Sequence, residues 1–258
     1  MTAVLPRSAP TSTVAIPAPR TPADDAASDA LARVSANAPA VGYERVVHRM
    51  VRREFRLLAD LARWASADDA DRAAELTSHA DLLARVLMQH HATERDLLWP
   101  ALFRSLPGAG QDAAREPISE WSRRAALLDH SLRDLSTVGR QWAVALAPPS
   151  RAAFARACAS VADAVEAATE AEERDLLPLL ARHLPAAEWM AVRRAARNAL
   201  SGREQMLVLG LALEDACAID RARLLAGLPR AARTAWRVVG HRTFRTATVR
   251  LRGAPPAA

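Results

Sequence analysis

Residues 90–100 read His-His-Ala-Thr-Glu-Arg-Asp-Leu-Leu-Trp-Pro, near the end of a long segment in which apolar residues recur every three or four positions. A helix advances about 100° per residue, so this recurrence predicts one amphipathic helix over residues 69–105. The residues that share its apolar face are Leu83, Val86, Leu87, His90, Glu94, Leu97 and Ala101. His90 and Glu94 are therefore expected to lie side by side inside the protein, one turn apart.

Two buried polar groups cost free energy unless they find partners. An imidazole and a carboxylate one turn apart can meet this need by a hydrogen bond between them, or by holding one cation together. Because buried Glu is rare, the pair His90 and Glu94 favours a functional site over a simple core hydrogen bond. His91 lies beside this face, and His79, about 16 Å away along the axis, is too distant to join the same ion.

The rest of the chain also has the pattern of helices, because its long stretches of Ala, Leu, Arg and Glu favour helix and no window alternates as a strand does. Pro and Gly separate segments at residues 41–66, 69–105, 112–146, 150–183, 187–200, 204–226 and from 229 onward. Four long helices with short connections predict an all-α fold, an up-down-up-down four-helix bundle over residues 41–183. Residues 184–258 are expected to form additional C-terminal helices packed on the bundle, and the Pro/Ala-rich residues 1–40 a disordered tail.

A weak internal repeat supports this layout. The second segment contains Glu-Arg-Asp-Leu-Leu-Trp-Pro at residues 94–100, and the fourth contains Glu-Arg-Asp-Leu-Leu-Pro at residues 173–178. Two helices related by repetition are expected to occupy similar places in the bundle. Pro178 also predicts a kink or an early stop in the fourth segment.

Further candidate ligands lie on the apolar faces of two other predicted helices. His48 is centred on the face of the first helix, between Val41 and Val51. Glu172 falls in the middle of the apolar face of the fourth helix. Glu173 is the neighbouring alternative that the repeat favours, whereas the helical face favours Glu172.

The third helix offers a weaker candidate in His130, which lies roughly 120° from the centre of the apolar face. Asp134 follows one turn later on the same side, so the two residues form either a surface pair or a flank of the site. His130 is kept as the fifth candidate ligand.

The motif at residues 90–100, together with His48, Asp129-His130 and Glu172-Glu173 before Leu-Leu-Pro178, resembles the hemerythrin HHE cation-binding family. The resemblance covers roughly residues 41–183. The segment from Leu228 to Arg245 is similar to the tail of actinobacterial hemerythrin-domain proteins.

This resemblance implies a non-haem di-iron centre inside the four helices, held by about five His and two carboxylates, in proteins that bind oxygen or handle nitric oxide, peroxide, iron or redox changes. The positions that match the family's ligands are His48, His90, Glu94 and Glu172, with His130 as a further match. The chain departs from the pattern at Ala168, where the family has a His one turn before its Glu, and at Ala126, one turn before His130. We therefore expect iron as the cofactor of an incomplete ligand set, mononuclear, weakly held or lost, with a small diatomic or oxidant molecule as partner.

The charge of the chain leaves a further alternative open. The formal net charge is +6, and all 35 basic residues are Arg. From Arg221 to Arg252 there is no Asp or Glu, so this segment either presents a solvated helix face or meets phosphates or an anionic membrane surface. No nucleic-acid motif accompanies it, so nucleic acid is not the expected partner. A metal-free helical scaffold is the other alternative to a cation-binding protein.

Several classes of protein are not expected from this sequence. No stretch is long and apolar enough to span a membrane, and no apolar signal segment opens the chain. Cys158 and Cys217 lie far apart and form no disulfide framework, which suits the cytoplasm. Neither a nucleophile elbow nor a phosphate-binding Gly loop is present, so we expect no enzyme.

Overall fold

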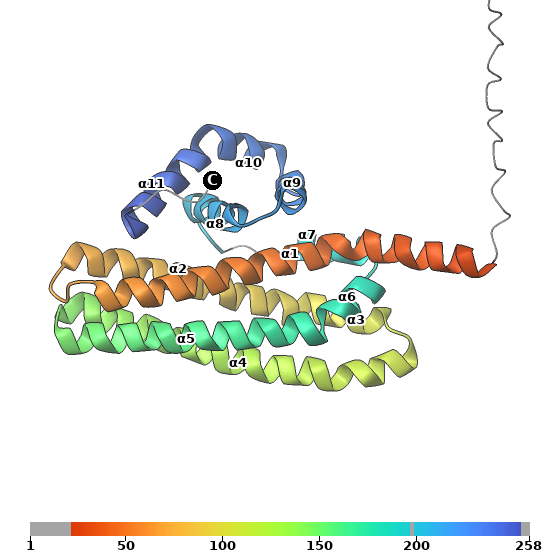
Figure 1. The fold of residues 1–258 in the computed structure, drawn as a ribbon, viewed down its shortest axis with the longest axis horizontal. Coiled ribbons are helices and arrows are strands. Elements are labelled where there is room, and N and C mark those ends of the chain that lie inside the picture. The colour runs from red at the N-terminus through yellow and green to blue at the C-terminus, as the bar shows by residue number, and fades with distance from the viewer. Residues whose placement is uncertain (1–21, 197–198, 254–258) are drawn as a thin grey trace, which may run out of the picture.

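The computed structural model describes residues 22–196 and 199–253, and within them every regular element is helical and no strand occurs. Four long helices form an antiparallel bundle in which α1 packs along α2 and α5, and α4 packs on the other sides of α2 and α5 (Figure 1). The bounds of these helices are α1 Pro22–Trp64, α2 Ala70–Thr93, α4 Gly108–Ala145 and α5 Pro148–Asp175. The predicted all-α bundle with additional C-terminal helices is confirmed.

Local sequence explains how two of these helices begin. The Asp69 carboxylate accepts a hydrogen bond from the Arg72 backbone N–H and caps α2. Pro148 lies in the first turn of α5, where a backbone N–H would have no acceptor within the helix. The missing N–H of proline therefore removes no hydrogen bond there. Short connections then suffice to reverse the chain between neighbouring helices.

The helix that carries the His90 motif changes its winding at Glu94. α2 passes into a π-helical turn, η1 (Glu94–Leu98), and continues as α3 (Trp99–Ser105), so the Trp99 N–H donates to the Glu94 carbonyl five residues back. Pro100 lacks an N–H and its ring crowds the carbonyl four residues before it, which a wider turn relieves. Single π-helical turns often occur at functional sites.

The first helix is longer than the sequence predicted. The expected tail covered residues 1–40, yet the structure begins α1 at Pro22 and carries it through Pro39. The prediction gave too much weight to prolines: four of them precede residue 20, Pro22 occupies a helix start, and the stretch between Pro22 and Pro39 is rich in Ala. Residues 1–21, the rest of the predicted tail, lie outside the described residues.

Two other predicted segments divide into shorter helices. The fourth segment breaks at Leu176, directly before α6 (Leu177–His183), as Pro178 led us to expect. The segment predicted at 204–226 divides into α8 (Gly202–Glu214) and α9 (Ala218–Ala226).

Two apolar clusters fill the protein, and polar residues lie between them. Along α2 and η1, Leu87 belongs to one cluster and Leu98 to the other. Likewise, Val165 of α5 belongs to the first cluster, and Leu176, directly after α5, belongs to the second. Since His90, Glu94 and Glu172 fall inside these intervals, the fold surrounds a short polar layer with apolar packing on both sides along the bundle.

The C-terminal helices stand on the side of the bundle formed by α1 and α2 (Figure 1). Phe244 of the last helix packs against Gly210 of α8, where an added Cβ would lie 2.2 Å from the ring. The remaining elements are α7 Ala186–Ala195, α10 Arg230–Ala235, the π-helical turn η2 Trp236–Gly240 and α11 His241–Arg252.

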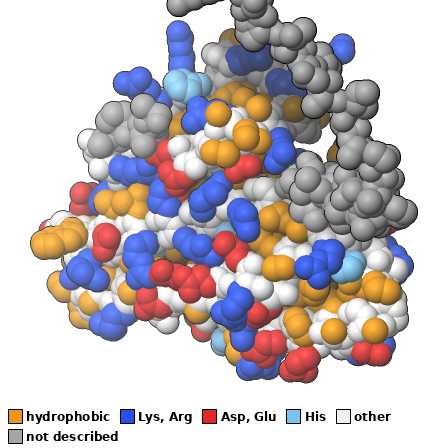
Figure 2. Space-filling view, turned by 45° about the vertical axis from the view of Figure 1, so that its right-hand side comes forward, with side chains coloured by type: hydrophobic (Ala, Val, Ile, Leu, Met, Phe, Trp, Pro, Cys, Tyr) orange, Lys and Arg blue, Asp and Glu red, His pale blue; other side chains and the backbone are white. Residues whose placement is uncertain are grey.

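The surface mixes charge with apolar side chains. Figure 2 shows Arg, acidic and hydrophobic side chains interspersed over the face in view. None of the described helices combines the length and the apolarity needed to cross a bilayer.

Candidate metal centre

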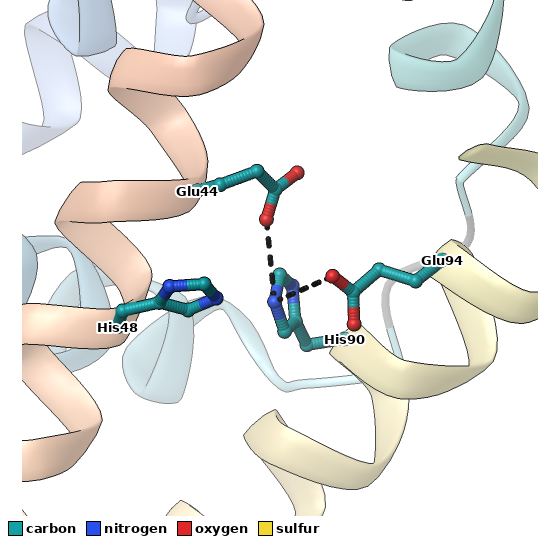
Figure 3. A group of neighbouring side chains, drawn as sticks. All are labelled: Glu44, His48, His90 and Glu94. Carbon is teal, nitrogen blue, oxygen red and sulfur yellow. Dashed lines mark ion pairs between the residues drawn. The ribbon is translucent and has the colours of Figure 1, made fainter. Parts of the chain in front are cut away.

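Two helices bring four potential ligands together in the polar layer. Glu44 and His48 come from α1, His90 from α2, and Glu94 from the start of η1 (Figure 3). One ligand atom from each residue lies within 4.8 Å of those of the others. All four side chains are at most 9% exposed, so this is an interior cluster rather than a surface group of charges.

The arrangement follows from spacing and helix direction. Glu44 and His48 are one turn apart on α1, as His90 and Glu94 are on the neighbouring helix, and the two sequences run in opposite order. Because the helices are antiparallel, each His faces the other His and each Glu faces the other Glu. The rings of His48 and His90 lie 5.9 Å apart between centroids and meet edge to face.

Most of the atoms that face the centre have no hydrogen-bond partner among the described residues. His90 Nε2 lies 3.3 Å from a Glu44 oxygen and 3.4 Å from a Glu94 oxygen, and His48 Nε2 lies 3.5 Å from Glu172 Oε1. These nitrogens and oxygens are buried, yet none of them makes a hydrogen bond. Buried polar atoms are nearly always satisfied, so a convergent group of orphaned ones needs a separate explanation.

The spacing of these atoms fits a bound cation. Two ligand atoms bound about 2.1 Å from one metal ion lie about 3.0 Å apart at a right angle and about 3.4 Å apart in a tetrahedral arrangement. The separations around His90 and His48 are close to these values. The set of imidazole nitrogens and carboxylate oxygens therefore fits a cation in both geometry and donor type.

Glu172 joins the cluster from α5, whereas Glu173 acts from outside it. The Trp121 Nε1–H donates to the second Glu172 oxygen at 3.2 Å and so fixes the carboxylate. Glu173 lies 3.1 Å from His48 Nδ1 and accepts a bond of 2.7 Å from Arg52. The helical face favours Glu172 over Glu173, and the structure places Glu172 beside the centre.

The contact between Glu173 and His48 determines which nitrogen of the His48 ring can bind a metal ion. A proton on Nδ1 held by the carboxylate leaves the Nε2 lone pair facing the centre, the arrangement that ligating histidines commonly show. His91 makes an equivalent contact, with Nδ1 2.7 Å from Asp129 of α4. Both residues of that pair are buried.

His130 does not lie with these residues, which corrects the sequence prediction. Its side chain is 73% exposed and pairs with Asp134 at 3.4 Å on the outside of α4. The neighbouring Asp129 is the inward residue, because it follows the buried positions Trp121 and Ala125 at intervals of four residues along the helix. This exposed position agrees with the helical register of His130, which lies away from the apolar face.

Glu44 is the residue of the cluster that the sequence interpretation missed. It lies one turn before His48 on the same helical face, and the spacing of this pair matches that of His90 and Glu94. The signal was present, but a helix predicted to begin at Val41 placed Glu44 in the first turn, where charged residues are usually solvated. With α1 beginning at Pro22, Glu44 lies well inside the helix and is 2% exposed.

Ala168 opens a small cavity beside the centre. A space of about 20 Å³ is lined by His48, His90, Ala168 and Glu172 with other residues of α2, α4 and α5, room for about one water molecule. The small side chain of Ala168, one turn before Glu172, leaves this space open, and a larger side chain at that position would reach the cluster.

Burial and the neighbouring charges shift the pKa values of the cluster in different directions. Burial, with Glu172 nearby, raises the pKa of Glu44 to about 8, and burial raises the pKa of Glu94 well above its usual value. Burial alone would lower the pKa of His48, but Glu172 outweighs it and raises that pKa to about 9. Burial lowers the pKa of His90 to about 3. Neighbouring carboxylates in an apolar interior favour a cation between them.

Comparison with known proteins identifies the family. A model of the hemerythrin HHE cation-binding domain matches residues 42–201, which is more than half of the chain and includes the whole cluster. No curated protein and no solved structure matches the chain. The matched range contains the motif at residues 90–100 and the polar layer around it, and the chain belongs to the hemerythrin HHE cation-binding family.

Proposed function

We propose that this protein binds iron in the polar layer and serves in oxygen, nitric oxide, redox or iron handling. The five ligands would be Glu44, His48, His90, Glu94 and Glu172. The observation that supports the proposal is the convergence of their buried, unpartnered atoms at separations close to the edges of a coordination polyhedron.

The donor types favour iron over softer metals. Two imidazoles and three carboxylates suit a divalent ion such as ferrous iron, and no thiolate takes part. Cys158 lies buried in the apolar core, where burial raises the pKa of its thiol, and Cys217 is exposed. The family itself is named for cation binding.

Five side-chain donors favour one ion for each chain. Four of them converge within 4.8 Å of one another, and Glu172 would add a fifth through its contact with His48, whereas two ions would each lack most of their ligands. The cavity beside Ala168 adjoins His48, His90 and Glu172, so a small exogenous molecule would have room there. A bound ferrous ion supplies reversible coordination of small molecules and one-electron exchange with them.

The surrounding residues prepare the ligands for this role. Glu173 holds the Nδ1 side of His48, and Trp121 orients Glu172. The two apolar clusters on either side limit the access of water to the layer. We propose binding and redox response, rather than substrate turnover, as the activity of such a centre.

The stabilisation of the fold by iron tests this proposal. A ligand that binds only the native state raises the free energy of unfolding, so ferrous iron added without air should raise the urea midpoint of the full chain. His90→Ala should abolish the shift, and the matched control His130→Ala, at an exposed position, should keep it. An unchanged midpoint for the native chain would overturn the proposal and favour a metal-free scaffold.

A further inference from the structure

A second, larger cavity lies between the bundle and the C-terminal helices, and it shares no lining residue with the cavity beside the polar layer. Its volume is about 1050 Å³, at the upper end of the range for small-molecule sites. One wall is formed by α2, another by α8, and the third by η2 and α11. The cavity therefore depends on the position of the C-terminal helices on the side of the bundle.

Apolar side chains line this cavity from each of its walls. Leu82 comes from α2, Leu207 from α8 and Leu251 from α11. Val239 of η2 also lines the cavity, and it is 59% exposed. Apolar side chains that gather around a cavity favour an apolar occupant, because such a molecule removes their surface from water.

The charges around the cavity favour an occupant without charge. The paired residues are Arg250 with Glu75, Glu204 with Arg85, and Arg252 with Glu54 and Glu214. The other charged lining residues are exposed to water, and they are Asp71, Arg203 and Arg242. A charged occupant would give up its hydration for a site whose inner charges already have partners, which costs free energy.

One buried side chain of the wall offers a polar contact to an uncharged occupant. His79 of α2 lines the cavity and is 8% exposed, and its Nε2 atom lies 3.1 Å from Glu54 Oε2. A proton on Nε2, held by this carboxylate, leaves the lone pair of Nδ1 as a hydrogen-bond acceptor. Nδ1 makes no hydrogen bond with the described residues, and it is not among their fully enclosed atoms. The His79 ring therefore presents an acceptor that a ligand O–H can reach.

From these observations we propose that the cavity binds an uncharged aromatic molecule that carries a hydroxyl group. The hydroxyl donates to Nδ1 of His79, and the rings lie against Leu82, Leu207 and Leu251. Met206 of α8 lines the same cavity, and a thioether sulfur makes favourable contacts with aromatic rings. Aromatic rings also bury a large apolar area with few rotatable bonds.

Displacement of the uncharged fluorescent probe N-phenyl-1-naphthylamine from the full chain tests this site. The probe should gain emission on saturable binding, and 4-phenylphenol should displace it. The anion biphenyl-4-carboxylate, of similar size, should need a concentration at least about tenfold higher, because it must lose its hydration. Absence of saturable binding would overturn the proposal, and so would equal displacement by the phenol and the anion.

The hydroxyl contact is tested with a second ligand and a variant of His79. The analogue 4-fluorobiphenyl has nearly the shape of 4-phenylphenol but donates no hydrogen bond. In His79→Phe, the ratio of the two affinities should shift against the phenol by about three- to tenfold, because one hydrogen bond is lost. His130→Phe, exposed on α4, should leave the ratio unchanged. An unchanged ratio in His79→Phe would contradict the contact.

Variants at exposed positions locate the site without a change in the core. Ala74→Trp adds bulk to the cavity from α2 and should weaken probe binding by about tenfold or more. Ala113→Trp, exposed on α4 and away from the cavity, should leave it unchanged. Equal binding by both variants would place the probe elsewhere and contradict the proposal. Circular dichroism reports whether each variant remains folded, and the assay needs no iron, so its outcome is independent of the proposed iron site.

Discussion

His48 and Glu173 meet at the Nδ1 atom of the imidazole ring, 3.1 Å from the carboxylate, so the Nε2 atom of the ring faces the polar layer. Glu173 therefore orients the proposed ligand His48, although Glu173 is not itself a ligand. It belongs to a group of contacts behind the polar layer, with Arg52 on Glu173 and Trp121 on Glu172. Such partners usually contribute strongly to metal affinity.

Loss of the Glu173 carboxylate should weaken the iron site. Glu173→Ala should lower iron affinity by about 10- to 100-fold, measured by competition with a chelator, because the His48 ring loses the partner that sets its tautomer. Glu173→Gln should cost less, since its amide oxygen still accepts the Nδ1 proton. Glu170→Ala, an exposed change on the same helix, is the control. Equal affinity of the native and Glu173→Ala proteins would contradict the orienting role.

A histidine at position 168 should strengthen the centre. Ala168 lines the cavity that adjoins His48, His90 and Glu172, so Ala168→His brings one more imidazole to the cluster. Iron should then be released to a chelator more slowly than from the native chain. Ala167→His, exposed at the next position, should have no such effect. Faster release from Ala168→His would show that the new side chain disrupts the layer instead of completing it.

Glu54 ties the last helix to the bundle through buried charge. Its side chain is fully buried and contacts His79 at 3.1 Å, Arg53 at 2.7 Å and Arg252 of α11 at 2.6 Å. Glu54→Ala leaves His79 without this partner, whereas Arg53 and Arg252 keep Glu214. The free energy of unfolding should therefore fall by about 1–3 kcal/mol, measured by urea denaturation at pH 7. A loss of less than about 1 kcal/mol would show that the network contributes little.

The same carboxylate should make stability depend on pH. Burial would raise the pKa of Glu54, but His79, Arg53 and Arg252 outweigh it and lower that pKa to about 2, below the ordinary value of 4.5. A lowered pKa in the folded state contributes stability that is present above about pH 4.5 and is lost as the pH falls toward 2. The full contribution is of the order of 3 kcal/mol. Glu54→Gln should flatten this part of the pH profile, and an unchanged profile would contradict the assignment.

Gly210 allows α8 and α11 to approach each other. An added Cβ would lie 2.2 Å from the Phe244 ring, so Gly210→Ala should destabilise the packing of the C-terminal helices by about 1–3 kcal/mol. Hydrogen exchange in α11 should become faster, whereas exchange in α4 should stay unchanged. Replacing Phe244 by Leu in the same chain should restore part of the protection. Equal exchange in Gly210→Ala and the native protein would contradict the close contact.

Helical periodicity predicted much of this architecture because the apolar faces of the bundle are regular. His48, His90, Glu94 and Glu172 were found by asking which polar residues interrupt those faces. Glu44 was missed through an error in a helix end, since end positions depend on local capping and on the tolerance of helices for single prolines. His130 was included because of its resemblance to a motif, against its helical register.

Contacts between distant segments could not be read from the sequence. The pairing of Glu173 with His48 joins residues 125 apart in the chain, and its geometry depends on the packing of α5 against α1. The cavity beneath the C-terminal helices likewise depends on how α8 and α11 sit on α2. Periodicity predicts which face of a helix is buried, but it does not predict the element that covers that face.

The iron content of the full chain tests the proposed centre most directly. After loading with ferrous iron without air and removal of the excess, elemental analysis should find about one iron for each native chain. Glu44→Ala should retain far less, and His130→Ala should retain as much as the native protein. A native chain that retains no iron, or a Glu44→Ala protein that retains as much as the native one, would contradict the proposed site.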